Sequence, residues 1–177
     1  MTQLYLPSSD LDLVVVGSLG LSPLRKLATA LEAAGLAARM ELIEKARVPI
    51  IKMVDSVVGF NVDISFNVTS GVDSGRLVKE AIEIFPALRP LMMVIKQFLL
   101  ERGLNEVFSG GLGSYSLAVM IISFLQLHPR VQTGEVDPSD NLGVFLVEFL
   151  ELYGRSFGNA NVGVSVLAGG SYMRRVR

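Results

Sequence analysis

The sequence predicts an α+β fold, with a small mixed β-sheet lobe at residues 1–71 followed by an all-helical lobe at residues 72–177. Three observations lead to this fold class. The first part of the chain holds short β-branched runs bounded by Gly and Ser, as strands do, with one helical pattern among them. From Val72 onward, apolar residues recur at helical spacing instead. Half of the 177 residues are apolar, enough to bury a core, and no low-complexity linker separates the lobes.

The first lobe is predicted to contain four strands and one helix. The run LDLVVV reads as a strand that Gly17 closes. A helix is expected over Ser22–Ala34, because Ser22 and Pro23 suit the N-cap and first helical position and Gly35 suits the end. Three further segments read as strands, the last two joined by a turn around Ser56–Gly59: Met40–Ile43, Val48–Val54 and Phe60–Phe66. The helix is expected to cover one face of the resulting sheet.

The second lobe is predicted to be built from helices separated by Pro and Gly. Four segments carry the pattern: Ser74–Ile84, Ala87–Arg102, Ser114–Leu127 and Asn141–Tyr153. The two most apolar stretches, Leu91–Leu100 and Leu112–Leu127, contain Lys96 and several Ser residues, so they are expected to be buried helices and not membrane spans. The tail, Gly158–Arg177, is expected to form one strand followed by an irregular basic end.

Composition narrows the possible chemistry. The chain has no Cys and a single His, His128, which argues against thiol catalysis, disulfides, Cys/His zinc sites and a histidine-based triad. Its 16 Lys and Arg against 17 Asp and Glu give a formal charge of −1, so no excess positive field attracts nucleic acid. The first residues lack a signal-peptide pattern, which favours an intracellular protein. Any catalysis is therefore expected to depend on carboxylates.

Three aspartates form the candidate catalytic group. Asp10 and Asp12 are two apart on a predicted strand, so their side chains project to the same face. Asp63 is a lone acid in the apolar strand NVDISF, where it needs a partner to offset its desolvation. If the two strands are neighbours, the three carboxylates can hold two Mg²⁺ ions with phosphate oxygens. The other interpretation is that Asp-x-Asp after a Ser-rich turn is only a cap.

A glycine-rich loop leads into the predicted helix at Ser114–Leu127. Its backbone N–H groups and the Ser114 hydroxyl can meet a phosphate, and Tyr115 can stack on a base. The alternative is a tight interhelical turn in which Ser114 is the N-cap and Tyr115 is a core residue. Lys96 lies among apolar neighbours, so its ammonium either reaches a polar cleft that binds triphosphate or extends into solvent.

Several segments together resemble the nuclear terminal nucleotidyltransferases of the polymerase-β superfamily, and in particular poly(A) polymerases of the TRAMP-complex type. The matching segments are LPSSDLDLVVV, VPIIKM, VDISFN, LMMVIKQFLLERGLNEVFSGGLGSYSL, SFLQLHPR and DNLGVFLVEFLELYG. The resemblance covers nearly the whole chain. It implies a palm-like nucleotidyltransferase lobe followed by the helical central lobe of these enzymes, with truncation at both ends that removes a Gly-Ser motif and a nucleotide-recognition loop.

The resemblance also implies roles for particular residues. Asp10, Asp12 and Asp63 match the catalytic metal ligands, which take Mg²⁺ or Mn²⁺. Asn67 lies where these enzymes approach the nucleotide ribose. Lys96 and Ser114 match triphosphate contacts, and Tyr115 matches the aromatic residue that stacks on the base. The substrate implied is ATP, from which AMP is added to an RNA 3′ end with release of pyrophosphate.

The family further implies partners and a location. Its members act in the nucleus, and in some cases the nucleolus, on RNA that is marked for trimming or decay. They work with a zinc-knuckle RNA-binding protein and an RNA helicase, and not at a membrane. Two alternatives stay open from the sequence: a terminal uridylyltransferase, and a catalytically inactive fragment that binds partners.

Overall fold

The structure, a computed structural model, describes residues 3–17, 22–46, 48–68, 70–158 and 160–174, and it divides into two compact units. The sheet unit is Pro7–Asp73. The helical unit takes the described residues before Pro7 together with those from Ser74 onward. The packing of the first residues with the helical unit was not predicted. The assignment of residues 1–71 and 72–177 to two family domains stays a prediction.

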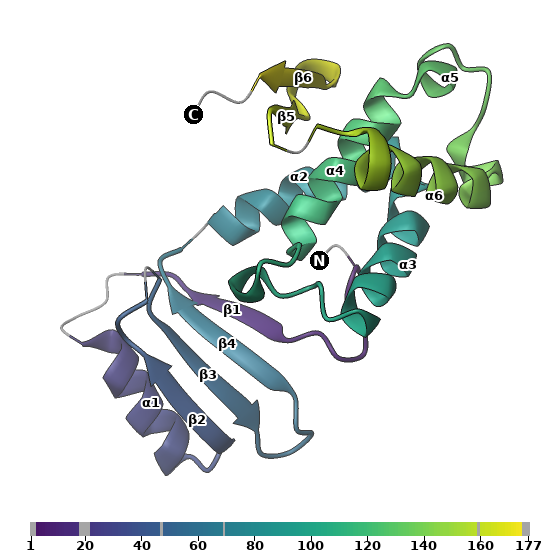
Figure 1. Cartoon of the computed structure of the whole chain (residues 1–177). Helices are drawn as coiled ribbons and strands as arrows, with labels where there is room; N and C mark the ends of the chain where they lie inside the picture. Colours follow the sequence, from purple (N-terminus) through teal and green to yellow (C-terminus); the bar gives the residue numbers. More distant parts are fainter. Residues whose placement is uncertain (1–2, 18–21, 47, 69, 159, 175–177) are drawn as a thin grey trace. The chain divides into compact units, whose positions relative to one another are not determined.

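The sheet unit is a four-stranded mixed sheet in the order β1-β4-β3-β2 (Figure 1). Its strands are β1 (Leu11–Val15), β2 (Ala37–Ile43), β3 (Ile50–Asp55) and β4 (Asn61–Phe66). β1 and β4 are parallel, and the other pairs are antiparallel. The predicted mixed sheet is confirmed, and the predicted strand boundaries differ from the observed ones by up to three residues.

One helix covers one face of this sheet, as predicted. Helix α1 (Pro23–Ala33) buries Leu24 and Ala28 against apolar side chains of the two central strands, namely Ile51, Met53, Val62 and Ile64. Ser22 does occupy the N-cap position, but it adopts φ 56 and its side chain makes no capping hydrogen bond. The helix start therefore depends on Pro23, whose fixed φ suits a first turn, and on this burial.

The turn between β3 and β4 is held by a single side chain. The Asp55 Oδ2 atom accepts hydrogen bonds from the backbone N–H groups of Val57 and Val58, at 3.1 and 2.7 Å. Gly59 completes the turn at φ 76, a conformation that glycine adopts without strain. The predicted turn at Ser56–Gly59 is thus confirmed, and it sets the register of the β3–β4 pair.

The helical unit is built on α2 (Ser70–Ile84), α3 (Leu88–Glu101), α4 (Ser114–Leu127) and α6 (Leu142–Glu151), of which α2 begins in the last residues of the sheet unit. Short helical segments join or extend them: η1 (Val107–Ser109), α5 (Pro129–Gln132), η2 (Pro138–Asp140) and η3 (Leu152–Ser156), the last a π-helix. The four predicted helices are confirmed. No helix within the described ranges is both long and apolar enough to cross a membrane.

The core of the helical unit centres on α4, whose buried residues occupy most of its circumference. Phe145 of α6 is completely buried, and its ring begins a chain of aromatic contacts that runs through Phe124 and Phe149 to Tyr153. The Tyr153 hydroxyl donates to the Met120 carbonyl at 3.1 Å, and burial raises the pKa of Tyr153 to about 12. Apolar packing thus joins α4 to α6, and a part-buried hydrogen bond joins α4 to η3.

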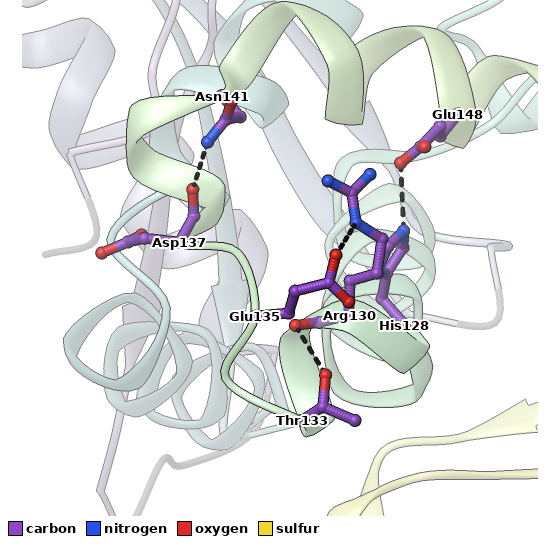
Figure 2. A network of polar contacts seen from close by, with 7 residues as sticks. All are labelled: His128, Arg130, Thr133, Glu135, Asp137, Asn141 and Glu148. Atoms are coloured by element: carbon purple, nitrogen blue, oxygen red, sulfur yellow. Dashed lines mark hydrogen bonds and ion pairs between the residues drawn. The ribbon is translucent and has the colours of Figure 1, made fainter.

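Polar contacts hold the connection between α4 and α6 (Figure 2). His128 Nε2 lies 3.0 Å from Glu148 Oε2, while Arg130 pairs with Glu135 at 3.4 Å. The Asn141 amide donates to the Asp137 carbonyl at 3.1 Å. The single His of the chain therefore helps to fix the packing of two helices.

The C-terminal segment differs from its prediction. It contains two antiparallel strands, β5 (Val162–Ser165) and β6 (Ser171–Arg174), and not one. Gly170 permits the reversal, since it adopts φ 90 and a Cβ there would lie 2.8 Å from Gln126 Oε1 of α4. The prediction of a single strand was wrong because it did not use the Gly169-Gly170 pair, whose φ values of 87 and 90 permit the reversal, as a turn signal. The prediction of an irregular end at residues 175–177 lies outside the described residues.

Candidate active site

The three candidate aspartates gather on one face of the sheet unit. Parallel pairing of β1 and β4 places Asp12 directly beside Asp63 in the register. Asp10, just before β1, projects to the same side as Asp12 because side chains alternate along an extended chain. The predicted adjacency of the two aspartate-bearing strands is therefore confirmed, and the face is the one opposite α1.

The row that contains Asp12 and Asp63 continues across the whole sheet. Asp63 pairs with Lys52 of β3 in the register, and Lys52 pairs with Glu41 of β2. Four charged side chains thus stand side by side in the order Asp12, Asp63, Lys52, Glu41. Lys52 Nζ lies 3.3 Å from Asp63 Oδ2. The partner that a carboxylate in an apolar strand requires is therefore Lys52.

A second row on the same face, two residues along the strands, contains Asp10. Asn61 donates from Nδ2 to Asp10 Oδ1 at 3.1 Å. In the same row, Asn61 pairs with Val54, and Val54 with Arg39. An open groove of about 510 Å³ runs over the two rows, and it is lined in part by Asp10, Asp63, Lys52, Asn61, Arg39 and Glu41. Asp10 and Asp63 therefore border a space that a ligand can enter, while Asp12 is not among its lining residues.

The pKa of Asp12 is shifted by its surroundings. Partial burial, followed by the negative charges of Asp63 and Asp10, raises its pKa above the ordinary value, while Lys52 acts in the opposite direction. The negative charges of Asp63 and Asp10 therefore act on Asp12. A divalent cation is the ligand that relieves such repulsion, and carboxylate oxygens are the donors that Mg²⁺ and Mn²⁺ accept.

The carboxylates fit a metal site by chemistry but are not drawn together as metal ligands. Among the residues that the structure describes, no three His, Cys, Asp or Glu side chains are arranged to hold a metal ion. The reason lies in the contacts of the two outer aspartates, since Asp10 is bound to Asn61 and Asp63 to Lys52. The backbone register nevertheless places Asp12 and Asp63 side by side.

Asn67 follows β4 at the end away from Asp10. It adopts φ 53, and both atoms of its amide bind the backbone of Gly17: Oδ1 accepts from the N–H at 2.9 Å and Nδ2 donates to the carbonyl at 3.1 Å. Asn67 lies four residues beyond Asp63, about 13 Å along an extended strand. In this structure it therefore fixes the end of β1, and its role toward a ribose stays a prediction.

Lys96 belongs to the helical unit and has a partner there. Its Nζ donates to the backbone carbonyl of Leu4 at 2.6 Å, and Leu4 itself is buried in the helical core. Burial lowers the pKa of Lys96. The ammonium thus neither extends freely into solvent nor stands without a partner, and it holds the first described residues against α3.

The glycine-rich loop before α4 packs closely against the preceding backbone, and it leaves the start of α4 exposed. Gly110 adopts φ 88, and Gly111 approaches the Leu104 carbonyl too closely for any side chain. Gly113, not Ser114, is the N-cap of α4. Ser114 is exposed, and Tyr115 is 48 % exposed, so the interpretation of Tyr115 as a core residue was wrong. The first turn of α4 offers backbone N–H groups that no intrahelical bond uses.

Two residues beside the aspartates were missed by sequence reasoning as parts of the site: Lys52 and Asn61. A signal was available for Lys52, which is the one cation in the apolar run of β3 and faces the side opposite Ile51 and Met53. Asn61 carried no such signal, because its contact with Asp10 spans 51 positions of sequence and depends on parallel pairing.

Comparisons with known families agree with the resemblance inferred from the sequence. The family described as "Poly(A) RNA polymerase, mitochondrial-like, central palm domain" matches residues 1–80. The family described as "Cid1 family poly A polymerase" matches residues 141–177. The two matches cover the sheet unit and the last part of the helical unit.

Individual relatives match nearly the whole chain. Poly(A) RNA polymerase protein 2 of Saccharomyces cerevisiae is 47% identical over 165 residues, which are 91% of this chain and 28% of the relative. A protein of Drosophila melanogaster named "Inactive non-canonical poly(A) RNA polymerase protein Trf4-2" is 40% identical over 182 residues, 99% of this chain and 44% of the relative. The chain thus spans between about a quarter and a half of the length of these relatives.

A solved structure shows the same fold. The polymerase core of TRAMP, described as an RNA surveillance complex, superimposes with a TM-score of 0.88 at 44% identity, covering 98% of this chain and 55% of that one. The fold is therefore that of the nucleotidyltransferases of the polymerase-β type. Within this class, the chain is homologous to the poly(A) RNA polymerases, as the sequence analysis predicted.

Proposed function

We propose that this chain is the catalytic core of a template-independent RNA 3′-terminal adenylyltransferase. The observation that carries the proposal is the register of β1 and β4, which sets Asp12 beside Asp63 with Asp10 on the same face. It occurs in a chain whose relatives at 43 to 47% identity are named poly(A) RNA polymerases. In the reaction, the RNA 3′ oxygen bonds to the α-phosphorus of ATP, the bond to the bridging oxygen breaks, and pyrophosphate and a proton leave.

The aspartates are proposed to hold two divalent cations, Mg²⁺ or Mn²⁺, which when bound supply charge neutralisation at the phosphates and activate the 3′ hydroxyl. Asp12 is the central ligand, since the other two carboxylates flank it electrostatically. Asp10 and Asp63 turn toward the same point after leaving Asn61 and Lys52. No covalent intermediate with the protein is required, so positioning and electrostatics supply the rate enhancement.

Four residues besides the aspartates are proposed to contact the nucleotide. Ser114 and the start of α4 suit the triphosphate, because helix N-termini stabilise anions. Lys96 contributes a positive charge to the triphosphate, and its ammonium would then leave or share the Leu4 carbonyl. Tyr115 is exposed enough to stack on the adenine base. Asn67 contacts the ribose while its amide keeps the Gly17 backbone in place.

Nuclear RNA surveillance is the proposed setting, and its support is the similarity to the polymerase core of TRAMP. The formal charge of −1 gives this chain little electrostatic attraction to RNA of its own. We therefore propose that the RNA 3′ end is delivered by a zinc-knuckle RNA-binding protein and an RNA helicase in a TRAMP-like complex. Co-purification of such partners with the chain, from a nuclear extract, would test this part.

The alternative functions receive less support. A uridylyltransferase is disfavoured because the relatives with the higher identities are named poly(A) RNA polymerases. An inactive role has a precedent in the name of the Drosophila relative. It is disfavoured here by the presence of all three aspartates, with Asp12 beside Asp63 in the register.

A primer-extension assay tests the proposed function. The chain is incubated with a labelled oligoadenylate RNA, Mg²⁺ or Mn²⁺, and each of the four NTPs in turn. We expect extension with ATP, and loss of that extension in Asp10→Ala. Extension with UTP in preference to ATP would establish the uridylyltransferase instead. Folded protein that extends no primer with any NTP, even with the RNA-binding partner added, would support the inactive alternative.

A further inference from the structure

Lys52 stands where a cation is needed when the site contains no metal. Its ammonium lies 3.3 Å from Asp63 Oδ2, in the row that also contains Asp12. The side chain of Asp63 is 21% exposed and that of Lys52 is 46% exposed, so the pair lies partly buried at the groove. A divalent cation on Asp63 would sit close to this ammonium, and the two positive charges would repel each other.

Lys52 also has a second carboxylate within reach. The register pairs Lys52 with Glu41 of β2 on its other side. Side chains paired in this way have Cβ atoms about 4.5–5.5 Å apart, so the flexible Lys stem can reach either carboxylate without any backbone movement. Both carboxylates and Lys52 line the same groove.

We propose that Lys52 is a positioning residue that neutralises Asp63 in the metal-free protein and moves its ammonium to Glu41 when a divalent cation binds. The inference rests on the proposed function, since it assumes that Asp12 and Asp63 hold the cation. It accounts for two features at once: the lack of a ready metal cluster in the described part of the chain, and the unbroken row of alternative partners across four strands.

This arrangement has a consequence for metal affinity. Lys52 keeps Asp12 and Asp63 compatible with folding before the cation arrives, but it also competes with that cation for Asp63. Removing the ammonium should therefore destabilise the metal-free protein and strengthen metal binding. An ion pair that served only the fold would behave differently, because its loss would lower stability by the same amount with and without metal.

Binding of Mn²⁺ alone tests the proposal, with free Mn²⁺ measured by electron paramagnetic resonance on the purified chain. We expect Lys52→Met to bind Mn²⁺ about tenfold more tightly than wild type, because a unit charge near a divalent ion is worth 1–2 kcal/mol even when well solvated. Lys52→Arg, which keeps the charge, should stay within about twofold of wild type. Equal or weaker binding by Lys52→Met would overturn the proposal.

Glu41→Gln provides the second, independent variant. With no carboxylate to receive it, the ammonium stays near Asp63, so we expect Mn²⁺ binding about threefold weaker than wild type. Thermal unfolding gives a further readout: Mn²⁺ should raise the Tm of Lys52→Met more than that of wild type. If Lys52→Met does not fold, the Glu41→Gln result decides, and unchanged affinity there overturns the inference.

These measurements distinguish a failure of the role proposed for Lys52 from a failure of the proposed metal site. If wild-type Mn²⁺ binding is insensitive to Asp12→Asn and Asp63→Asn, the proposed metal site itself is wrong. If binding requires both aspartates but ignores Lys52 and Glu41, the site stands and only the role of Lys52 fails.

Discussion

The two units of the molecule bury their side chains in different ways. Among the described residues, the helical core contains seventeen buried apolar side chains, and the sheet core contains six. The other face of the sheet carries a row of charged residues in the order Asp12, Asp63, Lys52, Glu41, of which Asp63 is half-buried and the other three are exposed. The comparison teaches that the proposed chemistry lies on the unit with the thinner core, where strands keep carboxylates in register and a groove keeps them accessible.

The largest effect on stability is expected in the helical core. Phe145→Ala removes a completely buried ring from the helical core, so it should lower the free energy of unfolding by about 3–5 kcal/mol. Urea denaturation measures this. Val147→Ala, on the same helix but 63% exposed, is the matched control and should cost less than about 0.5 kcal/mol. Similar losses in both variants would contradict the assignment of the core to this face of α6.

In the sheet unit, replacement of a proposed metal ligand should reduce activity without reducing stability. Asp63→Asn removes a proposed metal ligand, and it should reduce primer extension more than about 100-fold, beyond the usual cost of losing a supporting residue. Thermal unfolding should change little, because the neutral amide removes repulsion with Asp12 as well as the pair with Lys52. Glu80→Gln, on the exposed side of α2, serves as control. Full activity in Asp63→Asn would show that Asp63 is not part of the active site.

Tyr115 tests whether the helical unit also carries an exposed functional residue. Stacking on a base is worth about 1–3 kcal/mol, so Tyr115→Ala should raise the KM for ATP by about 5- to 150-fold. Because the side chain is 48% exposed, unfolding should remain nearly unchanged. Tyr115→Phe keeps the ring and should restore the KM. An unchanged KM in Tyr115→Ala would mean that no base stacks there.

Lys96 has one observed partner, the Leu4 carbonyl, and one proposed partner, the triphosphate of ATP. Lys96→Met keeps the apolar stem but removes the hydrogen bond to the Leu4 carbonyl, which should cost about 1 kcal/mol of stability. It should also raise the KM for ATP if the ammonium contacts the triphosphate. Lys79→Met, exposed on α2, is the control for charge alone. A raised KM with unchanged stability would show that the contact with Leu4 contributes nothing to folding.

The smallest effect concerns the pH dependence of the sheet unit. The pKa of Asp12 is raised in the folded protein, so its contribution to stability is fully present below its unfolded pKa and is lost as the pH rises through the folded pKa. At pH 7, without metal, Asp12→Asn should therefore be slightly more stable than wild type, by less than about 1 kcal/mol because the group is partly solvated. Near pH 3 the difference should vanish. Calorimetry at both pH values checks the sign.

Local patterns were sufficient for much of the fold. The helix that starts at Pro23, the turn at Ser56–Gly59 and the helix at Ser114–Leu127 each carry their own signals, so each was predicted close to its observed position. The predicted tail failed because the Gly169-Gly170 pair, which permits the β5–β6 reversal, was not interpreted as a turn. For the site, spacing alone placed Asp10 and Asp12 on one face. Spacing could not show which side chains contact these two aspartates.

The sequence by itself determined the order of the elements, the shared face of the aspartates and the family resemblance, because periodicity, caps and motifs are local properties. Only the tertiary structure decided that Asp63 stands between Asp12 and Lys52, that Asn61 holds Asp10, and that Lys96 binds Leu4. Each of these contacts joins residues that are from 11 to 92 positions apart. Strand register and helix packing alone bring such residues together, and both follow from the burial of the whole core.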